Sequence, residues 1–258
     1  LKPIQTKLPG IHFTEVLPQL AKLTEHLALV RTYASGNDDH LMSQAAGLSG
    51  RKVTAAQVTT EPNLGSICAK LNGPRAGFPG YIAIPGTTRP GPPPYNLLVG
   101  GWLGREYAPF PTGGAPKNAD FTAKVIEAPE EQFHKQGLDH FAGLDKDRLN
   151  ARRSLREELE VGLRTTEKAD ALSEQYRGAF EMLLAPGVRK AFEFEQESAK
   201  VRDRYGRTKI GTRCLLARRL VEAGAPFVLV DYGYDPEYGN LWDNHNAAVQ
   251  NFPPICEM

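Results

Sequence analysis

The sequence lacks any apolar run near the ~20 residues that a membrane-spanning helix needs, since its longest apolar stretches, such as Phe227-Val-Leu-Val230, have the length of a strand. Its three cysteines (Cys68, Cys214 and Cys256) are odd in number and far apart, which favours neither a disulfide framework nor a zinc ribbon. With 31 basic and 30 acidic side chains, the net charge is only +1. Nucleic-acid-binding domains carry a marked basic excess. We therefore expect a globular protein with no membrane span and no nucleic-acid partner.

Familiar functional motifs are also missing from the sequence. There is no P-loop, no H-E-x-x-H, no G-x-S-x-G and no EF-hand loop. No signal peptide is visible at Leu1, and the residues up to Met258 have the composition of the middle of a domain. We therefore expect the chain to be a fragment of a larger domain that lacks both ends.

Glycine (25) and proline (20) are abundant, together about a sixth of the chain against an average of ~12%. Almost half of them lie between Gly73 and Pro116, where regular helix and central sheet are disfavoured. A flexible linker would have this composition. The aromatic side chains of the same stretch favour an ordered excursion packed on the domain instead. We therefore interpret residues 73–117 as a Gly/Pro-rich insertion.

Two helix–strand–loop units are predicted from hydrophobic periodicity. In the first, a helix over residues 13–27 precedes a β-type run at Leu27–Tyr33 and the polar loop Ser35–His40; helices over 40–48 and 64–71 follow. In the second, a helix capped by Thr208 presents Ile210, Cys214, Ala217 and Val221 on one side. It ends at Gly224 and precedes the buried strand Phe227–Asp231 and a polar loop to His245. Residues 145–200 form a charged helical segment. We expect an α/β fold with both loops at the functional edge of a parallel sheet.

These two loops carry the candidate site residues. Asn37-Asp-Asp-His40 places the carboxylates of Asp38 and Asp39 and the imidazole of His40 just before a helix, where oxygen ligands suit a hard cation. In Trp242-Asp-Asn-His245, Asp243 and His245 are spaced to ligate one divalent metal ion from a single loop. The same residue types also form ordinary turns, so the spacing leaves both interpretations open.

The segment His40-Leu-Met-Ser-Gln-Ala-Ala-Gly-Leu-Ser-Gly-Arg51 resembles the Leu-Thr-Gly-Arg segment of sulfatases, which share a superfamily with alkaline phosphatases. Almost the whole chain is similar to a bacterial branch of that superfamily, domain-of-unknown-function family fifteen-oh-one. The resemblance is carried by Leu17–Leu23, Leu27–Arg31, His40, Leu48–Gly50, Gly65-Ser66, Tyr81–Ile84, Gly104, Tyr107–Phe110, Arg152–Leu155, Arg202–Ala223 and Trp242–His245.

The resemblance implies an alkaline phosphatase-like α/β sandwich, a single domain of which residues 1–258 are an incomplete part. It further implies an exported or periplasmic location and a divalent metal cofactor that Asp243 and His245 bind. His40 occupies the position of the nucleophile, ten residues before Gly50, with Ser43 one helical turn on as the runner-up. An imidazole there changes the mechanism, because it replaces a hydroxyl nucleophile.

Two functions remain open on this evidence. The first is metal-dependent hydrolysis of a phosphate or sulfate ester, with a small molecule or glycan as the substrate and little activity in the fragment. The second is a non-catalytic exported domain that binds a protein or glycan partner through the aromatic Gly/Pro region. The sequence does not specify the metal, the substrate or the oligomeric state.

Overall fold

The computed structural model describes residues 2–86, 97–112, 146–161, 180–182, 184–231, 234–235 and 239–240. The α-helices are α1 (Pro18–Lys22), α2 (His40–Ser49), α3 (Leu64–Asn72), α4 (Lys146–Val161), α6 (Pro186–Ala191), α7 (Ala199–Tyr205) and α8 (Lys209–Glu222). The strands are β1 (Pro3–Gln5), β2 (His12–Thr14), β3 (Ile82–Ile84), β4 (Phe110–Pro111), β5 (Val228–Val230), β6 (Tyr234–Asp235) and β7 (Gly239–Asn240). Short 3₁₀ helices are η1 (Thr24–His26), η2 (Ala55–Gln57), η3 (Gly101–Leu103), η4 (Arg105–Tyr107) and η5 (Phe194–Gln196).

A parallel sheet lies at the centre of the described structure, with the strand order β4-β3-β5. Ile82 is in register with Val228 of β5 and with Phe110 of β4, and both pairings are parallel. Parallel strands that are covered on both faces consist of apolar residues, and so do β3 and β5. The prediction of an α/β fold with a parallel sheet is therefore confirmed.

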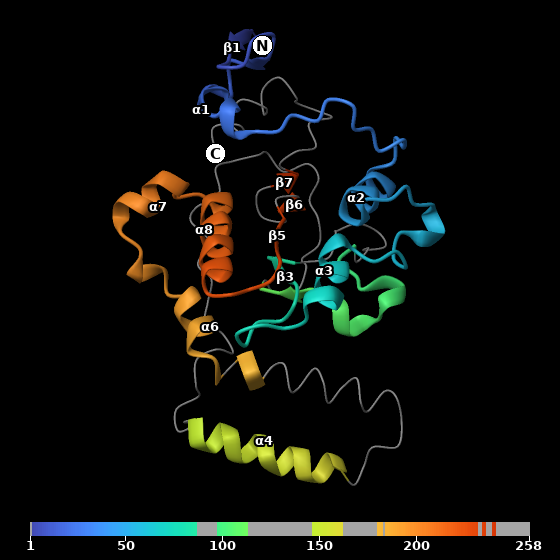
Figure 1. Cartoon of the computed structure of the whole chain (residues 1–258), viewed down its shortest axis with the longest axis vertical. Helices are drawn as coiled ribbons and strands as arrows, with labels where there is room; N and C mark the ends of the chain where they lie inside the picture. The colour runs from blue at the N-terminus through green and yellow to red at the C-terminus, as the bar shows by residue number, and fades with distance from the viewer. Residues whose placement is uncertain are drawn as a thin grey trace.

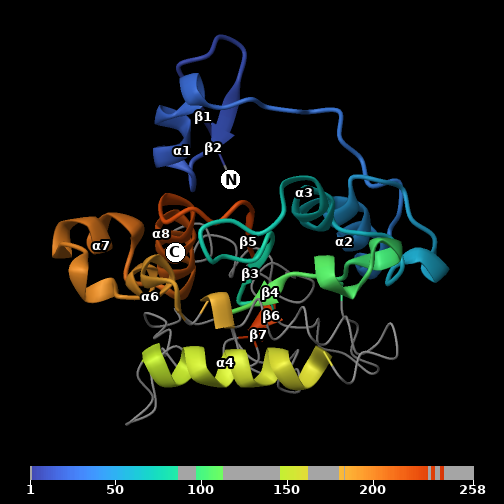
Figure 2. The ribbon, with the colours of Figure 1, turned by 60° about the horizontal axis from the view of Figure 1, so that its bottom comes forward.

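Side chains alternate across this sheet and form two separate cores. On one face, Ile82 and Ile84 of β3 pack with Leu216 and Leu220 of α8. On the other face, Tyr81 and Ala83 pack with helix α3 and with the Leu48 end of α2. Figures 1 and 2 show the same arrangement, with α8 and α6 on one side of β3 and β5 and with α3 and α2 on the other. The sheet is therefore covered by helices on both faces.

Helix α8 begins and ends where the sequence predicts. Thr208 caps its first turn by accepting a hydrogen bond from the Gly211 amide, and Gly224 after its end has a φ of +114°. The side that carries Ala217 and Val221 is only partly buried. Ala217 packs against the core and Val221 is 56% exposed, whereas Leu216 and Leu220 are fully buried. The helix also buries arginines, whose burial depends on the contacts described below.

The Gly/Pro-rich region contributes to the sheet itself. Its described part, residues 73–86 and 97–112, contains the central strand β3 and the edge strand β4. The apolar run Leu97–Val99 forms no strand. The buried side chain of Asn63 donates to the Leu97 carbonyl (3.0 Å) and accepts from the Val99 amide (3.2 Å), so side-chain contacts replace a strand ladder there.

The first helix–strand unit differs most from its prediction. The expected helix over 13–27 is reduced to α1 and η1, and the run Leu27–Tyr33 forms no strand and bends at residue 32. Figures 1 and 2 show β1, β2 and α1 apart from the sheet, with an extended segment leading from them to α2. None of the described helices is long and apolar enough to cross a membrane.

Candidate functional site

The loop before α2 is ordered by its own polar side chains. The Asn37 side-chain oxygen accepts a hydrogen bond from the Asp39 amide (2.8 Å). The Asp39 carboxylate in turn accepts from the Met42 amide (2.9 Å) and so forms the N-cap of the helix. An aspartate at this position satisfies an amide that has no partner within the helix and complements the positive end of the helix dipole. Asp39 therefore has a structural role in this conformation. Its side chain is exposed, as is that of Asp38 beside it.

His40 and Ser43, the predicted catalytic residues, lie on the first turns of α2. His40 is the first residue of the helix and is exposed. The Ser43 hydroxyl is half-buried, donates to the Asn37 carbonyl (2.9 Å) and lies 3.1 Å from the Ser35 hydroxyl. Both of these contacts are with uncharged oxygen atoms, and a serine nucleophile needs a base beside it. The geometry therefore gives Ser43 the role of fixing the loop and leaves His40 accessible to a ligand.

The fit of a metal ion can be tested on the donors around α2. In the part of the chain that the structure describes, no three His, Cys, Asp or Glu side chains lie close enough together to hold one. Asp38, Asp39 and His40 are all exposed, and the Asp39 carboxylate already accepts a backbone hydrogen bond. These three residues do not by themselves form a metal centre. The other predicted ligands, Asp243 and His245, lie outside the described residues.

The carboxyl edge of the sheet carries a further acidic residue, Asp231, directly after β5. Its amide donates to the Ile84 carbonyl (2.7 Å), and its carbonyl accepts from the guanidinium of Arg213 (2.9 Å). Arg213 lies on α8 and is 7% exposed. Burial, with a smaller contribution from the charge of Asp231, raises the pKa of the Tyr81 phenol well above its ordinary value, so Tyr81 stays protonated. Sequence reasoning did not select Arg213, although an arginine within an apolar helix just before a buried strand is a detectable signal.

The Leu-Ser-Gly-Arg segment that ends α2 has a structural explanation. Gly50 has a φ of +69° and donates its amide to the Ala46 carbonyl, as the residue that ends a helix commonly does. The guanidinium of Arg51 lies 2.9 Å from the carboxylate of Glu61, a residue that is 8% exposed. This segment therefore ends the helix and pairs a buried carboxylate.

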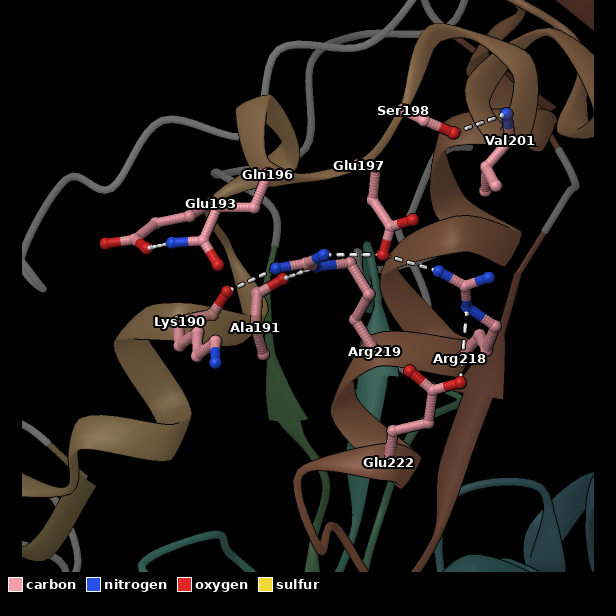
Figure 3. Close-up of polar contacts among 10 residues, drawn as sticks. All are labelled: Lys190, Ala191, Glu193, Gln196, Glu197, Ser198, Val201, Arg218, Arg219 and Glu222. Carbon is pink, nitrogen blue, oxygen red and sulfur yellow. Dashed lines mark hydrogen bonds and ion pairs between the residues drawn. The ribbon is translucent and has the colours of Figure 1, made fainter.

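The Arg202–Ala223 stretch also has a structural explanation, in a charged cluster between α8 and the chain before α7 (Figure 3). The Arg219 guanidinium donates to the Lys190 carbonyl (2.5 Å), the Ala191 carbonyl (2.8 Å) and the Glu197 carboxylate (2.6 Å). Arg218 donates to the same carboxylate (2.5 Å). These hydrogen bonds, that from Arg218 above all, lower the pKa of Glu197. The cluster joins the end of α6 to α8.

A cavity of about 270 Å³ lies beside this cluster, lined by residues of α6 together with Leu184, Ala185, Glu193 and Gln196. It contains none of the predicted site residues, and its volume is just below the ~300–1,000 Å³ of typical ligand pockets. We therefore do not assign it as the functional site.

Comparison with protein families places the chain in a family. The model of a family described as "Protein of unknown function (DUF1501)" matches residues 1–258. No curated protein and no solved structure matches the chain.

Proposed function

The chain belongs to the DUF1501 family of proteins of unknown function, and from this premise we propose that the protein is a metal-dependent hydrolase of phosphate or sulfate esters. The family match confirms that the chain belongs to the domain-of-unknown-function family that the separated motifs resemble. The further step, to an alkaline phosphatase-like sandwich and its hydrolytic chemistry, is part of the proposal.

The observation that carries the proposal is the carboxyl edge of the β4-β3-β5 sheet. Ligands of open α/β sheets bind outside the carboxyl ends of the strands. Asp231 directly follows β5 at this edge, and Asp243 and His245 come later in the sequence. An acidic residue therefore stands at the edge where a charged ester would bind, and the predicted metal ligands follow twelve and fourteen residues later.

Each candidate residue receives a role on this proposal. Asp243 and His245 are metal ligands, and a divalent metal, when bound, supplies positive charge for the oxygens of the ester. His40, exposed on the first turn of α2, faces the substrate. Asp39 and Ser43 hold the loop that presents His40, through their contacts with Met42 and Asn37.

A second candidate function is the binding of a protein or glycan partner by a non-catalytic, exported domain. Trp102 on η3 is 65% exposed and Phe110 on β4 is 38% exposed. Exposed aromatic side chains are common where proteins recognise partners. The substitution Trp102→Ala distinguishes the two functions, because it removes the largest of these exposed surfaces and leaves the predicted metal ligands unchanged.

Hydrolysis of chromogenic phosphate and sulfate esters, in the presence of Zn²⁺, Mn²⁺ or Ca²⁺, tests the proposal. We expect activity that requires the metal and disappears in the Asp243→Ala/His245→Ala double variant. The matched control is His26→Ala/Asp203→Ala, which also removes one histidine and one aspartate, with side chains 72% and 63% exposed. Absence of hydrolysis by the folded protein with every metal, or unchanged hydrolysis in the double variant, would contradict the proposal.

A further inference from the structure

The run Leu27–Tyr33 has the composition of a strand but no strand partner in the described structure. Leu27 has extended backbone angles, residues 28–31 form neither helix nor strand, and the chain bends at residue 32; the run contains neither glycine nor proline. Its apolar side chains are exposed to solvent: Leu29 at 54%, Val30 at 72% and Tyr33 at 67%. Burial of these side chains would remove apolar surface from water, which stabilises a fold by roughly 25 cal/mol per Å².

The sheet has a matching free edge on β5. The β3–β5 ladder uses the Phe227 carbonyl, which accepts from Ile82, and the Asp231 amide, which donates to Ile84. Because successive residues of a strand direct their backbone groups to opposite edges, those of Val228 and Val230 point away from β3. Among the described strands, none pairs with that edge.

The handedness of strand–helix–strand connections selects between the two edges of the sheet. Connections between parallel strands are right-handed, so two crossovers that run in opposite directions across a sheet place their helices on opposite faces. The connection from β3 to β5 contains α8, whose leucines pack on the Ile82 and Ile84 face. The connection from Leu27–Tyr33 to β3 contains α2 and α3, which pack on the Tyr81 and Ala83 face. The faces are opposite, so Leu27–Tyr33 belongs on the β5 side and not on the β4 side.

The chain can also reach this edge. Leu48, in the last turn of α2, and Leu229 of β5 both pack against the cluster that contains Tyr81 and Ala83, so α2 covers the face of the sheet to which β5 belongs. The six residues Ala34–Asp39 that join the run to α2 span up to about 20 Å when extended. Arg31, a charged residue near the end of the run, is typical of an edge strand, where charge discourages pairing with other molecules.

We propose that Leu27–Tyr33 docks along β5 as a fourth parallel strand of the same sheet. Docking places the loop Ser35–His40 beside the carboxyl end of β5, next to Asp231. That point of an open α/β sheet is where ligands bind. For this last step the inference rests on the proposed function: it brings His40 to the edge that carries Asp231 and, further along the chain, Asp243 and His245.

Amide hydrogen exchange followed by mass spectrometry tests the docking directly. In the docked strand alternate amides of residues 28–33, those that face β5, exchange about 100-fold or more slowly than in an unstructured peptide. We expect the substitution Val30→Asp to abolish this protection and to lower the Tm by several degrees. The matched control is Leu71→Asp on α3, whose side chain is 79% exposed. It leaves both the protection and the Tm unchanged.

Unprotected amides at 28–33 in the wild-type protein would overturn the inference, and so would equal effects of Val30→Asp and Leu71→Asp. Protection that depends on protein concentration, with a dimer in light scattering, would also overturn it, because a second copy would then supply the partner strand. The measurement needs neither a metal nor a substrate. Protected amides in a protein that hydrolyses no ester would therefore refute the proposed function and leave the docking intact.

Discussion

The Arg219–Glu197 contact gives a quantitative test of how α8 is held to the rest of the structure. Arg219 is 9% exposed and donates to two backbone carbonyls and one carboxylate, at 2.5–2.8 Å. Arg219→Met keeps the apolar stem of the side chain and removes all three hydrogen bonds. Each hydrogen bond with a charged group contributes roughly 1.5–3 kcal/mol. Glu197 keeps its hydrogen bond with Arg218 in the variant, so the total loss of stability is smaller than the sum of the three hydrogen-bond contributions.

We therefore expect Arg219→Met to lower the free energy of unfolding by about 3–5 kcal/mol, the usual cost of breaking a buried ion pair on one side. Urea unfolding followed by far-UV circular dichroism measures this loss as a lower midpoint at an unchanged slope. The loss is a large part of the ~5–15 kcal/mol that stabilises a typical domain.

Arg218→Met is the matched control, since Arg218 is the preceding residue and donates to the same carboxylate. Its side chain is 30% exposed, so its ion pairs are screened and their loss costs only about 1 kcal/mol. Equal losses in the two variants would refute the reasoning, as would a loss below about 1 kcal/mol for Arg219→Met.

Three further predictions concern the same structure. Because the pKa of Glu197 is lowered in the folded state, its contribution to stability is complete above the unfolded-state pKa of about 4.3 and is lost as the pH falls through the folded-state pKa. We therefore expect Glu197→Gln to be less stable than the wild type at pH 7. Between pH 5 and 3 its free energy of unfolding should fall by less than that of the wild type, in the same urea assay. A Cβ at Gly65 would lie 2.6 Å from the buried Tyr81 ring, so Gly65→Ala should lower the Tm despite the better helix propensity of alanine, and a raised Tm would contradict this packing. Without metal, Asp39→Ala should cost about 1 kcal/mol through loss of the N-cap, whereas Asp38→Ala should change stability by less than about 0.5 kcal/mol, and equal costs in thermal unfolding would refute the capping role.

The parts of the fold that follow from local chemistry were predictable from the sequence. β5 was recognised from a run of apolar residues between Pro226 and Asp231, and α8 from its cap at Thr208. Helices α2 and α3 begin where expected, at His40 and Leu64. In each case the local pattern and the tertiary environment favour the same structure.

The parts that depend on specific tertiary contacts were not predictable. The burial of Arg213 and Arg219 in α8 depends on carbonyl groups of Asp231, Lys190 and Ala191, far away in sequence. Hydrophobic periodicity treats arginine as a surface residue and therefore does not predict that Arg213 and Arg219 are buried. The Leu97–Val99 segment is apolar enough for a strand, but the buried Asn63 side chain satisfies its backbone.

The candidate site was predictable in part. The loop before α2 was correctly located, and the N-cap role of Asp39 follows from its position before a helix. The contacts of Ser43 with the loop depend on the fold of residues 35–37 and could not be read from spacing. The assignment of Asp243 and His245 as metal ligands rests on the resemblance and stays a prediction.

Metal content measured by elemental analysis is the most direct test of the central claim, that the protein is a metal-dependent ester hydrolase. The purified protein is stripped with a chelator, reloaded with Zn²⁺ or Mn²⁺, and freed of excess metal by gel filtration. The account predicts at least one equivalent of metal per folded chain, and much less in Asp243→Ala/His245→Ala. A folded wild-type protein that retains no stoichiometric metal, or a double variant that retains as much as the wild type, would contradict it.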